Sequence, residues 1–178
     1  MQEKEYLNNI KKLIEKDIVL VKKNRIYEEN HRLSTYFNIG KLLIQAQGGK
    51  ERSKYGNGLI KKWSIELTNL YGKGYDYTNL SRMRKLYLVF KKVGTPCQLS
   101  WSHYRYILPL IEESKRNYYI NICTKQNLSV RQLREKIKSK EYERLEYKGN
   151  IELITEDNNE LTFKSMLKDP LIIKTDIN

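Results

Sequence analysis

The sequence predicts a mainly α-helical protein, a helical bundle that contains helix-turn-helix-like units. Apolar residues recur at three- and four-residue spacing over most of residues 4 to 140, which is the period of amphipathic helices. Breaks that contain glycine or proline separate these stretches. At 178 residues, the chain is long enough for one substantial domain with an appended segment.

The first two helices are expected over residues 4–23 and 25–47. The apolar stripe of the first comprises Tyr6 or Leu7, Ile10, Leu13 or Ile14, and Val21. The apolar side of the second comprises Leu33, Tyr36, Phe37, Gly40, Leu43 and Ile44. Because glycine inside a helix costs about 1 kcal/mol relative to alanine, Gly40 predicts that another helix packs closely at that point. Gly48 and Gly49 end the second helix as C-cap residues.

The most informative stretch runs from Leu59 to Phe90 and predicts a helix, a tight turn at residues 71–76 and a second helix. The inner face of the second helix comprises Leu80, Met83, Tyr87 and Phe90. At about 100° per residue, the opposite face carries Thr78, Ser81, Arg82 and Lys85. A helix with a buried apolar side and an outer side of hydroxyls and cations suits the major groove of DNA.

Three further helices are expected after residue 96. Ser100 or Ser102 caps the first, which Pro109 should distort or shorten. The second spans about residues 112–125, and Ser129 caps the third, over residues 130–140. Arg131, Gln132 and Glu135 point outward from the third. Because Glu135 would repel phosphate, two roles are equally open for this third helix: a packing helix and a second recognition helix.

The sequence pattern changes from helical to strand-like after residue 141. Ile151–Thr155 and Leu161–Phe163 flank a polar stretch and predict a short β-hairpin. We therefore expect a helical domain over residues 1–148, followed at 149–178 by a hairpin and connector that leads towards a further domain.

The net charge of +13 predicts attraction to a polyanion, first nucleic acid and second an anionic membrane surface. Residues beyond Lys140 carry nine acidic and five basic side chains, a net −4, which leaves +17 for residues 1 to 140. The lysine-rich composition of an AT-rich genome would raise the charge without any function. The candidates for phosphate contacts in two glycine-containing loops are Lys50, Arg52, Lys54 and Lys73. Neither loop has the spacing of a nucleotide-binding P-loop.

Composition argues against several other classes of protein. The mean hydropathy is −0.72 and no apolar run approaches the roughly 18 residues of a membrane-spanning helix. The N-terminal residues lack the apolar core of a signal peptide, so the cytoplasm is the expected location. Two cysteines and two histidines without paired spacing predict no metal site, and no motif predicts a cofactor.

Several segments follow one another in an order resembling that of one family. Residues 36–40 (YFNIG) precede residues 55–59 (YGNGL) and residues 79–84 (NLSRMR), and residues 128–133 (LSVRQL) close the series. The most specific segment is residues 99–105 (LSWSHYR). Over residues 10 to 148, the chain resembles the N-terminal domain of the YhcG-type nuclease family.

The resemblance implies a helix-turn-helix domain that binds DNA and is joined to a C-terminal nuclease domain of the PD-(D/E)xK type. The family's motif falls on Asn79, Arg82, Arg84, Arg131 and Gln132. A nuclease of that type needs an acidic residue and a Glu-x-Lys on adjacent strands to hold Mg²⁺. The candidate, residues 113–115, lies in a helical pattern, so neither a catalytic residue nor an enzyme activity is expected in this chain.

The expected function is therefore binding of double-stranded DNA, as the targeting half of a nuclease system. Two other functions remain open. One is a protein-interaction scaffold that recruits a nuclease or defence partner, and the other is an RNA-binding domain in which Tyr75 and Tyr77 would stack on bases. The expected partners are DNA and a nuclease domain or subunit, while a homodimer and the target sequence are left open.

Overall fold

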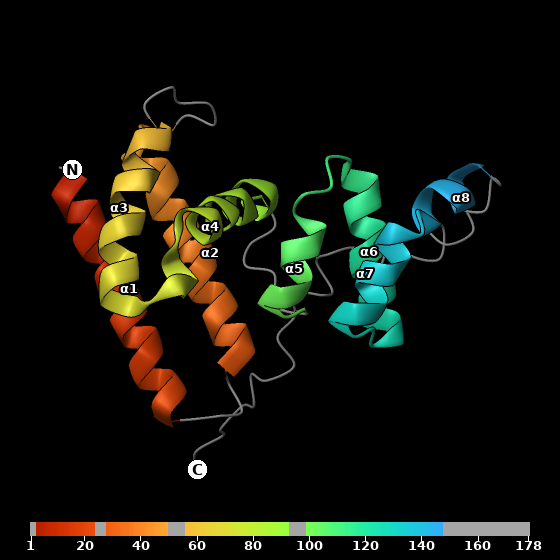
Figure 1. The fold of residues 1–178 in the computed structure, drawn as a ribbon, viewed down its shortest axis with the longest axis horizontal. Coiled ribbons are helices and arrows are strands. Elements are labelled where there is room, and N and C mark those ends of the chain that lie inside the picture. Colours follow the sequence, from red (N-terminus) through yellow and green to blue (C-terminus); the bar gives the residue numbers. More distant parts are fainter. Residues whose placement is uncertain (1–2, 24–27, 50–55, 93–98, 148–178) are drawn as a thin grey trace, which may run out of the picture.

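The computed structural model describes residues 3–23, 28–49, 56–92 and 99–147 (Figure 1). These ranges contain helices and no strand, which confirms the prediction of a mainly α-helical fold. In chain order the helices are α1 (Glu3–Lys23), α2 (Glu28–Ala46), α3 (Gly56–Tyr71), α4 (Tyr77–Phe90), α5 (Trp101–Ile107), α6 (Glu113–Gln126), α7 (Val130–Lys138) and α8 (Glu141–Tyr147). A short 3-10 helix, η2 (Lys73–Tyr75), precedes α4.

Helices α1 and α2 form an antiparallel pair on which α3 and α4 pack (Figure 1). The buried side of α1 carries Ile10 and Ile14, as the sequence predicts. It continues with Asp17, which is 4% exposed, whereas Val21 is only half-buried. The Asp17 carboxylate accepts a hydrogen bond from the Thr35 hydroxyl of α2 at 3.2 Å, which offsets part of the cost of burying the carboxylate.

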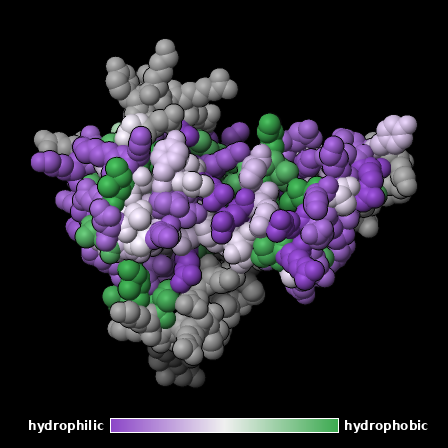
Figure 2. Space-filling model, viewed as in Figure 1, coloured by the Kyte–Doolittle hydropathy of each residue, from purple (hydrophilic) through white to green (hydrophobic). Residues whose placement is uncertain are grey.

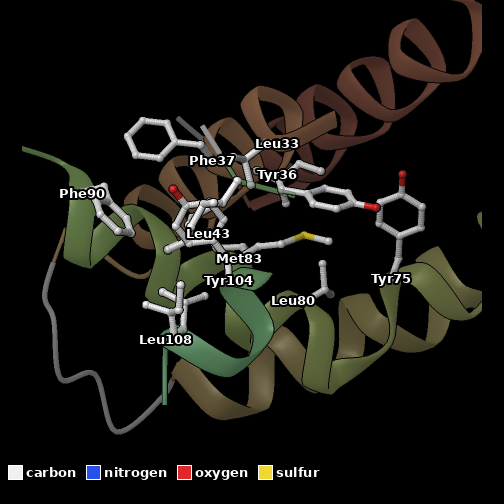
Figure 3. Packing of buried hydrophobic residues seen from close by; sticks show 14 of the residues in the cluster. Leu33, Tyr36, Phe37, Leu43, Tyr75, Leu80, Met83, Phe90, Tyr104 and Leu108 are labelled. Carbon is white, nitrogen blue, oxygen red and sulfur yellow. The ribbon is translucent and has the colours of Figure 1, made fainter. Parts of the chain in front are cut away.

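Helices α2 and α4 meet closely at Gly40 and Met83, and Met83 lies among the buried residues of the core (Figure 3). A Cβ on Gly40 would lie 2.1 Å from the backbone carbonyl oxygen of Met83, so no larger residue fits without a shift of α4. The close packing predicted at Gly40 is therefore confirmed. The apolar residues around the crossing come from α2, α4 and the region of α5, and include Leu33, Tyr36, Phe37, Leu43, Leu80, Met83, Phe90, Tyr104 and Leu108.

Helices α5 to α8 form a second group beside the first (Figure 1). Helix α5 ends at Ile107, two residues before Pro109, as predicted from the proline. Helix α6 ends at Gln126, and Asn127, with a left-handed φ of 48°, is its C-cap. The Ser129 hydroxyl then accepts the backbone N–H of Gln132 at 3.3 Å, so Ser129 caps α7 as expected.

The end of this second group differs from the prediction. The helix expected over 130–140 ends at Lys138, and a turn with Lys140 at φ 53° leads to α8, which the sequence pattern did not predict. Tyr142 of α8 is buried, and its ring centroid lies 5.5 Å from that of Tyr118 on α6. Aromatic burial thus holds a helix that is too short to be stable alone. The hairpin expected at 151–163 and the boundary expected at 148 lie outside the described residues.

Candidate nucleic-acid interface

The turn before α4 fixes where that helix begins. Gly72 has a φ of 89°, a conformation that favours glycine, and it opens η2. Tyr75 at the end of η2 is 7% exposed, and its ring centroid lies 6.3 Å from that of Tyr36. Asp76 is the N-cap of α4, since its carboxylate accepts the backbone N–H of Asn79 at 2.7 Å. Local sequence therefore sets which residues lie at the N-terminal end of α4.

Helix α4 directs its predicted inner face into the core. Leu80, Met83 and Phe90 are buried, as expected, and Leu86 is buried with them. Tyr87, which the periodicity placed in the same set, is half-buried and packs its ring against Phe37 with the centroids 5.2 Å apart. Leu86 thus adds to the predicted inner face and Tyr87 lies at its edge, so the buried side of α4 is wider than the sequence predicts.

The outer face of α4 carries three of the candidate residues, and a fourth, Arg82, lies at its edge. Thr78, Ser81 and Lys85 lie within about 40° of the direction opposite the buried side, and Arg82 lies about 80° from it. Thr78 is exposed, whereas the other three are half-buried. Tyr77, in the first turn, is 42% exposed. The part of α4 that is most open to solvent is therefore its N-terminal end.

Lys85 lies deeper, beside a second cation that the sequence pattern did not single out. Burial lowers the pKa of Lys85, and the nearby guanidinium of Arg116 on α6 lowers it further. One guanidinium nitrogen of Arg116 donates to the carbonyl oxygens of Leu110 and Ile111, at 2.9 and 2.6 Å. The two like charges share a partly desolvated site, so a bound anion there would relieve their repulsion. Only the tertiary structure, which brings Arg116 of α6 near Lys85 of α4, reveals this pair.

Asn79 and Arg82 are linked to the turn. The Asn79 side-chain amide donates to the backbone carbonyl of Lys73 at 3.2 Å, and its carbonyl oxygen accepts a long contact of 3.5 Å from Arg82. Asn79 is thus used within the turn, while the weak contact leaves Arg82 able to reorient towards a ligand. The Lys73 side chain is exposed beside this end of the helix.

Three candidates lie elsewhere. Arg84 donates to the side-chain carbonyl of Gln47 at 2.7 Å, so it faces the end of α2 and not the outer face of α4. Arg131 and Gln132 belong to α7, which lies beyond α5 from α4 (Figure 1). Gln132 completes a capping box, since its oxygen accepts the Ser129 backbone N–H at 2.8 Å.

Arg131 remains the outward candidate on α7. It is exposed, as are Arg134 and Lys138, and these three cations lie on one side of the helix at spacings of three and four residues. Glu135 is exposed on the same side. Lys50, Arg52 and Lys54, the loop candidates for phosphate contacts, lie outside the described residues.

His103 and Lys115 have structural partners. Both ring nitrogens of His103 are engaged, one with the Ser100 hydroxyl at 2.7 Å and the other with the Leu128 carbonyl at 2.9 Å. Lys115 pairs with Glu143 of α8. In the part of the chain that the structure describes, no three His, Cys, Asp or Glu residues come together as metal ligands, and no helix is long and apolar enough to span a membrane.

Comparisons with known proteins give two findings. A family model described as the DUF1016 N-terminal domain matches residues 10–144. A protein of Escherichia coli (strain K12) named "Putative nuclease YhcG" is 41% identical over 61 residues, which is 34% of this chain and 16% of that protein. The match thus spans about a sixth of the relative's length. No solved structure matches the chain significantly.

Proposed function

Since the chain belongs to the family of the DUF1016 N-terminal domain, we propose that it binds double-stranded DNA and directs a nuclease to it. The relative from E. coli is named "Putative nuclease YhcG", and about a third of the present chain matches a sixth of it. We assign the DNA-binding step to the helical domain and place no catalytic residue in it.

One observation carries the proposal: the N-terminal end of α4 is open, and hydroxyls and cations lie around its Asp76 cap. In helix-turn-helix proteins the N-terminal residues of the second helix reach the base edges in the major groove. Thr78 is exposed at this end of α4, with Arg82 one turn later and Lys73 on the preceding turn. On the face seen in Figure 2, hydrophilic residues predominate and hydrophobic ones form separate areas.

The residues divide into base and phosphate contacts by their position. Thr78, Ser81 and Arg82 would reach base edges, since hydroxyls read several bases and a guanidinium matches guanine. Lys73 would contact a flanking phosphate. Lys85, recessed beside Arg116, would contact a phosphate on the side of α6.

A protein-interaction scaffold is the second candidate function. Val19, Ile65 and Leu70 are 52%, 60% and 56% exposed, although each is a large apolar residue. Exposed apolar side chains on α1 and α3 would suit a protein partner. RNA binding has less support, because Tyr75 is buried and only Tyr77 of the two proposed stacking residues is exposed.

Fluorescence anisotropy with a labelled random duplex tests the proposal, over about 50 to 300 mM salt where phosphate contacts dominate the salt dependence. We expect Arg82→Ala alone to weaken binding by about 1–3 kcal/mol if Arg82 contacts a base. Arg82→Ala/Lys85→Ala should weaken it further and flatten the salt dependence. The matched control is Lys61→Ala/Lys125→Ala, which removes two exposed cations from α3 and α6.

Equal affinities for the two double variants would remove α4 from the binding site. Competition with a structured RNA separates the two nucleic acids, since preferential displacement of the duplex by RNA would favour the RNA-binding alternative. Salt-insensitive, weak binding by the wild type would favour the scaffold.

A further inference from the structure

A groove runs between α1 and α2 and is lined by polar side chains that the α4 proposal does not use. Its volume is about 480 Å³, within the usual range for ligand sites. Leu13 and Leu42 contribute its apolar lining. The polar residues of the groove are Asn9, Lys12, Lys16, Asn38, Lys41 and Gln45.

The three lysines of the groove differ from those lysines of the helices that form ion pairs. Lys11 pairs with Glu66 at 2.6 Å, and Lys136 pairs with Glu141 at 2.8 Å. Among the residues that the structure describes, Lys12, Lys16 and Lys41 have no carboxylate partner, and all three are exposed. No acidic side chain lines the groove. The groove is thus a site of concentrated positive charge.

The composition of the groove matches one class of ligand. Lysine ammonium groups and the amides of asparagine and glutamine are among the usual donors to phosphate oxygens. Lys12 and Lys16 lie one helical turn apart, about 6 Å along α1, so they would reach successive points along a backbone. The groove has no aromatic side chain, which disfavours a site built on stacked bases.

The groove and the outer face of α4 lie on different sides of α2. Gly40 faces α4, where a Cβ would meet Met83. The groove residues of α2 lie on average about 150° around the helix from Gly40, at about 100° per residue. A straight nucleic-acid segment that lies on one surface would therefore not reach the other.

We propose that the α1–α2 groove binds the sugar-phosphate backbone of nucleic acid as a second contact surface. Lys12, Lys16 and Lys41 neutralise phosphates, and the carboxamides of Asn9, Asn38 and Gln45 donate to phosphate oxygens beside them. The surface is independent of α4, and together the two surfaces let one protein molecule hold two segments of nucleic acid.

The test compares two triple variants of the full chain that remove the same charge. The groove variant is Lys12→Gln/Lys16→Gln/Lys41→Gln, and the matched control is Lys4→Gln/Lys61→Gln/Lys125→Gln. All six positions are exposed and glutamine is a good helix former, so both variants should fold. Binding of a labelled random duplex and of a single strand of equal length is measured across salt concentrations.

We expect the groove variant to lower the slope of log K against log salt by about 2 to 3 on duplex DNA, since each phosphate contact contributes about 0.9. The slope for a single strand should fall by about 0.7 per contact. The control should change either slope by less than about 1. A fall on both probes identifies a backbone site, and a fall on one probe identifies the strand form that the groove accepts.

Equal slopes for the two triple variants would overturn the proposal. A second result would also overturn it: the groove substitutions weaken binding of a labelled polyglutamate peptide but leave nucleic-acid binding unchanged. The ligand of the groove would then be an acidic protein. Repeating the measurement in the Arg82→Ala/Lys85→Ala background separates the two sites. If only the groove substitutions weaken binding, the α4 site is refuted and the groove site stands. If only Arg82→Ala/Lys85→Ala weakens binding, the groove site is refuted and the α4 site stands.

Discussion

Gly40 shows how a single residue sets the geometry of the core. The helices α2 and α4 approach so closely that the Met83 carbonyl occupies the space of a side chain at position 40. A glycine inside a helix carries an entropic cost, and close approach of a neighbouring backbone offsets it. The arrangement of the whole α4 face therefore depends on the absence of one methyl group.

Replacement of Gly40 by alanine should destabilise the protein despite the higher helix propensity of alanine. The new methyl group would overlap backbone atoms, and overpacking of this kind costs about 1–3 kcal/mol or more. Urea unfolding followed by circular dichroism measures the change in the free energy of unfolding.

Gly58→Ala is the matched control. Gly58 lies in α3, and a Cβ added there meets nothing within 4 Å. The expected change is neutral or up to about 1 kcal/mol stabilising. Equal effects of the two substitutions would show that the α2–α4 crossing is looser than the structure indicates.

At the scale of the element, helix caps fix both candidate recognition helices. Asp76 begins α4 and Ser129 begins α7, and each accepts a backbone N–H of its first turn. The caps decide which residues occupy the first turn, where a recognition helix contacts DNA. Asp76 also places a negative charge beside the proposed contact surface.

Two substitutions at Asp76 should separate the cap from the charge. Asp76→Ala should lower the free energy of unfolding by about 1 kcal/mol, since it leaves the Asn79 N–H without its partner. Asp76→Asn keeps a good N-cap residue and removes the carboxylate charge, so its stability should fall by only some tenths of a kcal/mol through the lost helix-dipole interaction.

DNA binding should respond differently to the same two changes. Asp76→Asn should bind duplex DNA more tightly than the wild type at low salt, because a repulsion with phosphate is removed. Unfolding curves and anisotropy titrations provide the two measurements. If neither variant binds DNA more tightly than the wild type, DNA does not approach this end of α4.

At the scale of the whole molecule, tyrosines connect the elements across the core. Tyr36 and Tyr75 join α2 to η2, and Tyr118 and Tyr119 of α6 contact Tyr142 of α8. Burial raises the pKa of each of these four phenols. Burial and a 2.7 Å hydrogen bond to Glu15 raise the pKa of Tyr71 to about 12.

These shifts predict a loss of stability at alkaline pH. A tyrosine in the unfolded chain has a pKa of about 10, so a raised pKa in the folded state favours the neutral phenol there. The contribution is fully present below about pH 10 and is lost as the pH rises towards the folded value, near 12 for Tyr71. Melting temperatures measured from about pH 8 to 11.5 should fall steeply above pH 10.

Phenolate absorbance and one pair of variants check this prediction. Tyr71→Phe should flatten the fall above about pH 10, because phenylalanine cannot ionise. Tyr77→Phe, at a position that is 42% exposed, serves as the control. A stability that falls equally in both variants would exclude Tyr71 from the alkaline transition.

Much of the fold could be predicted because amphipathic periodicity, caps and breakers act over a few residues. The inner face of α4, the glycine at the crossing and the serine cap of α7 follow from such local patterns. Asp17 was missed on α1, since an aspartate reads as an exposed residue until Thr35 is placed beside it. Helix α8 was missed because its seven residues are held by the contact of Tyr142 with α6 and not by an extended pattern.

The candidate site was predicted less completely. Periodicity placed Thr78, Ser81 and Lys85 on one face, but it cannot give the depth of a side chain. It also cannot reveal that Arg84 bonds to Gln47. The lysines of the α1–α2 groove were passed over because cations on separate helices show no common spacing.

By itself, the sequence determined the helical class, the turn before α4 and the family to which the chain belongs. These properties depend on interactions between residues close in the chain or on the order of short motifs. Only the tertiary structure decided that Lys85 lies beside Arg116 and that Lys12, Lys16 and Lys41 face one groove. Both arrangements join residues of different helices, and their distances are set by how whole helices pack, which no local pattern encodes.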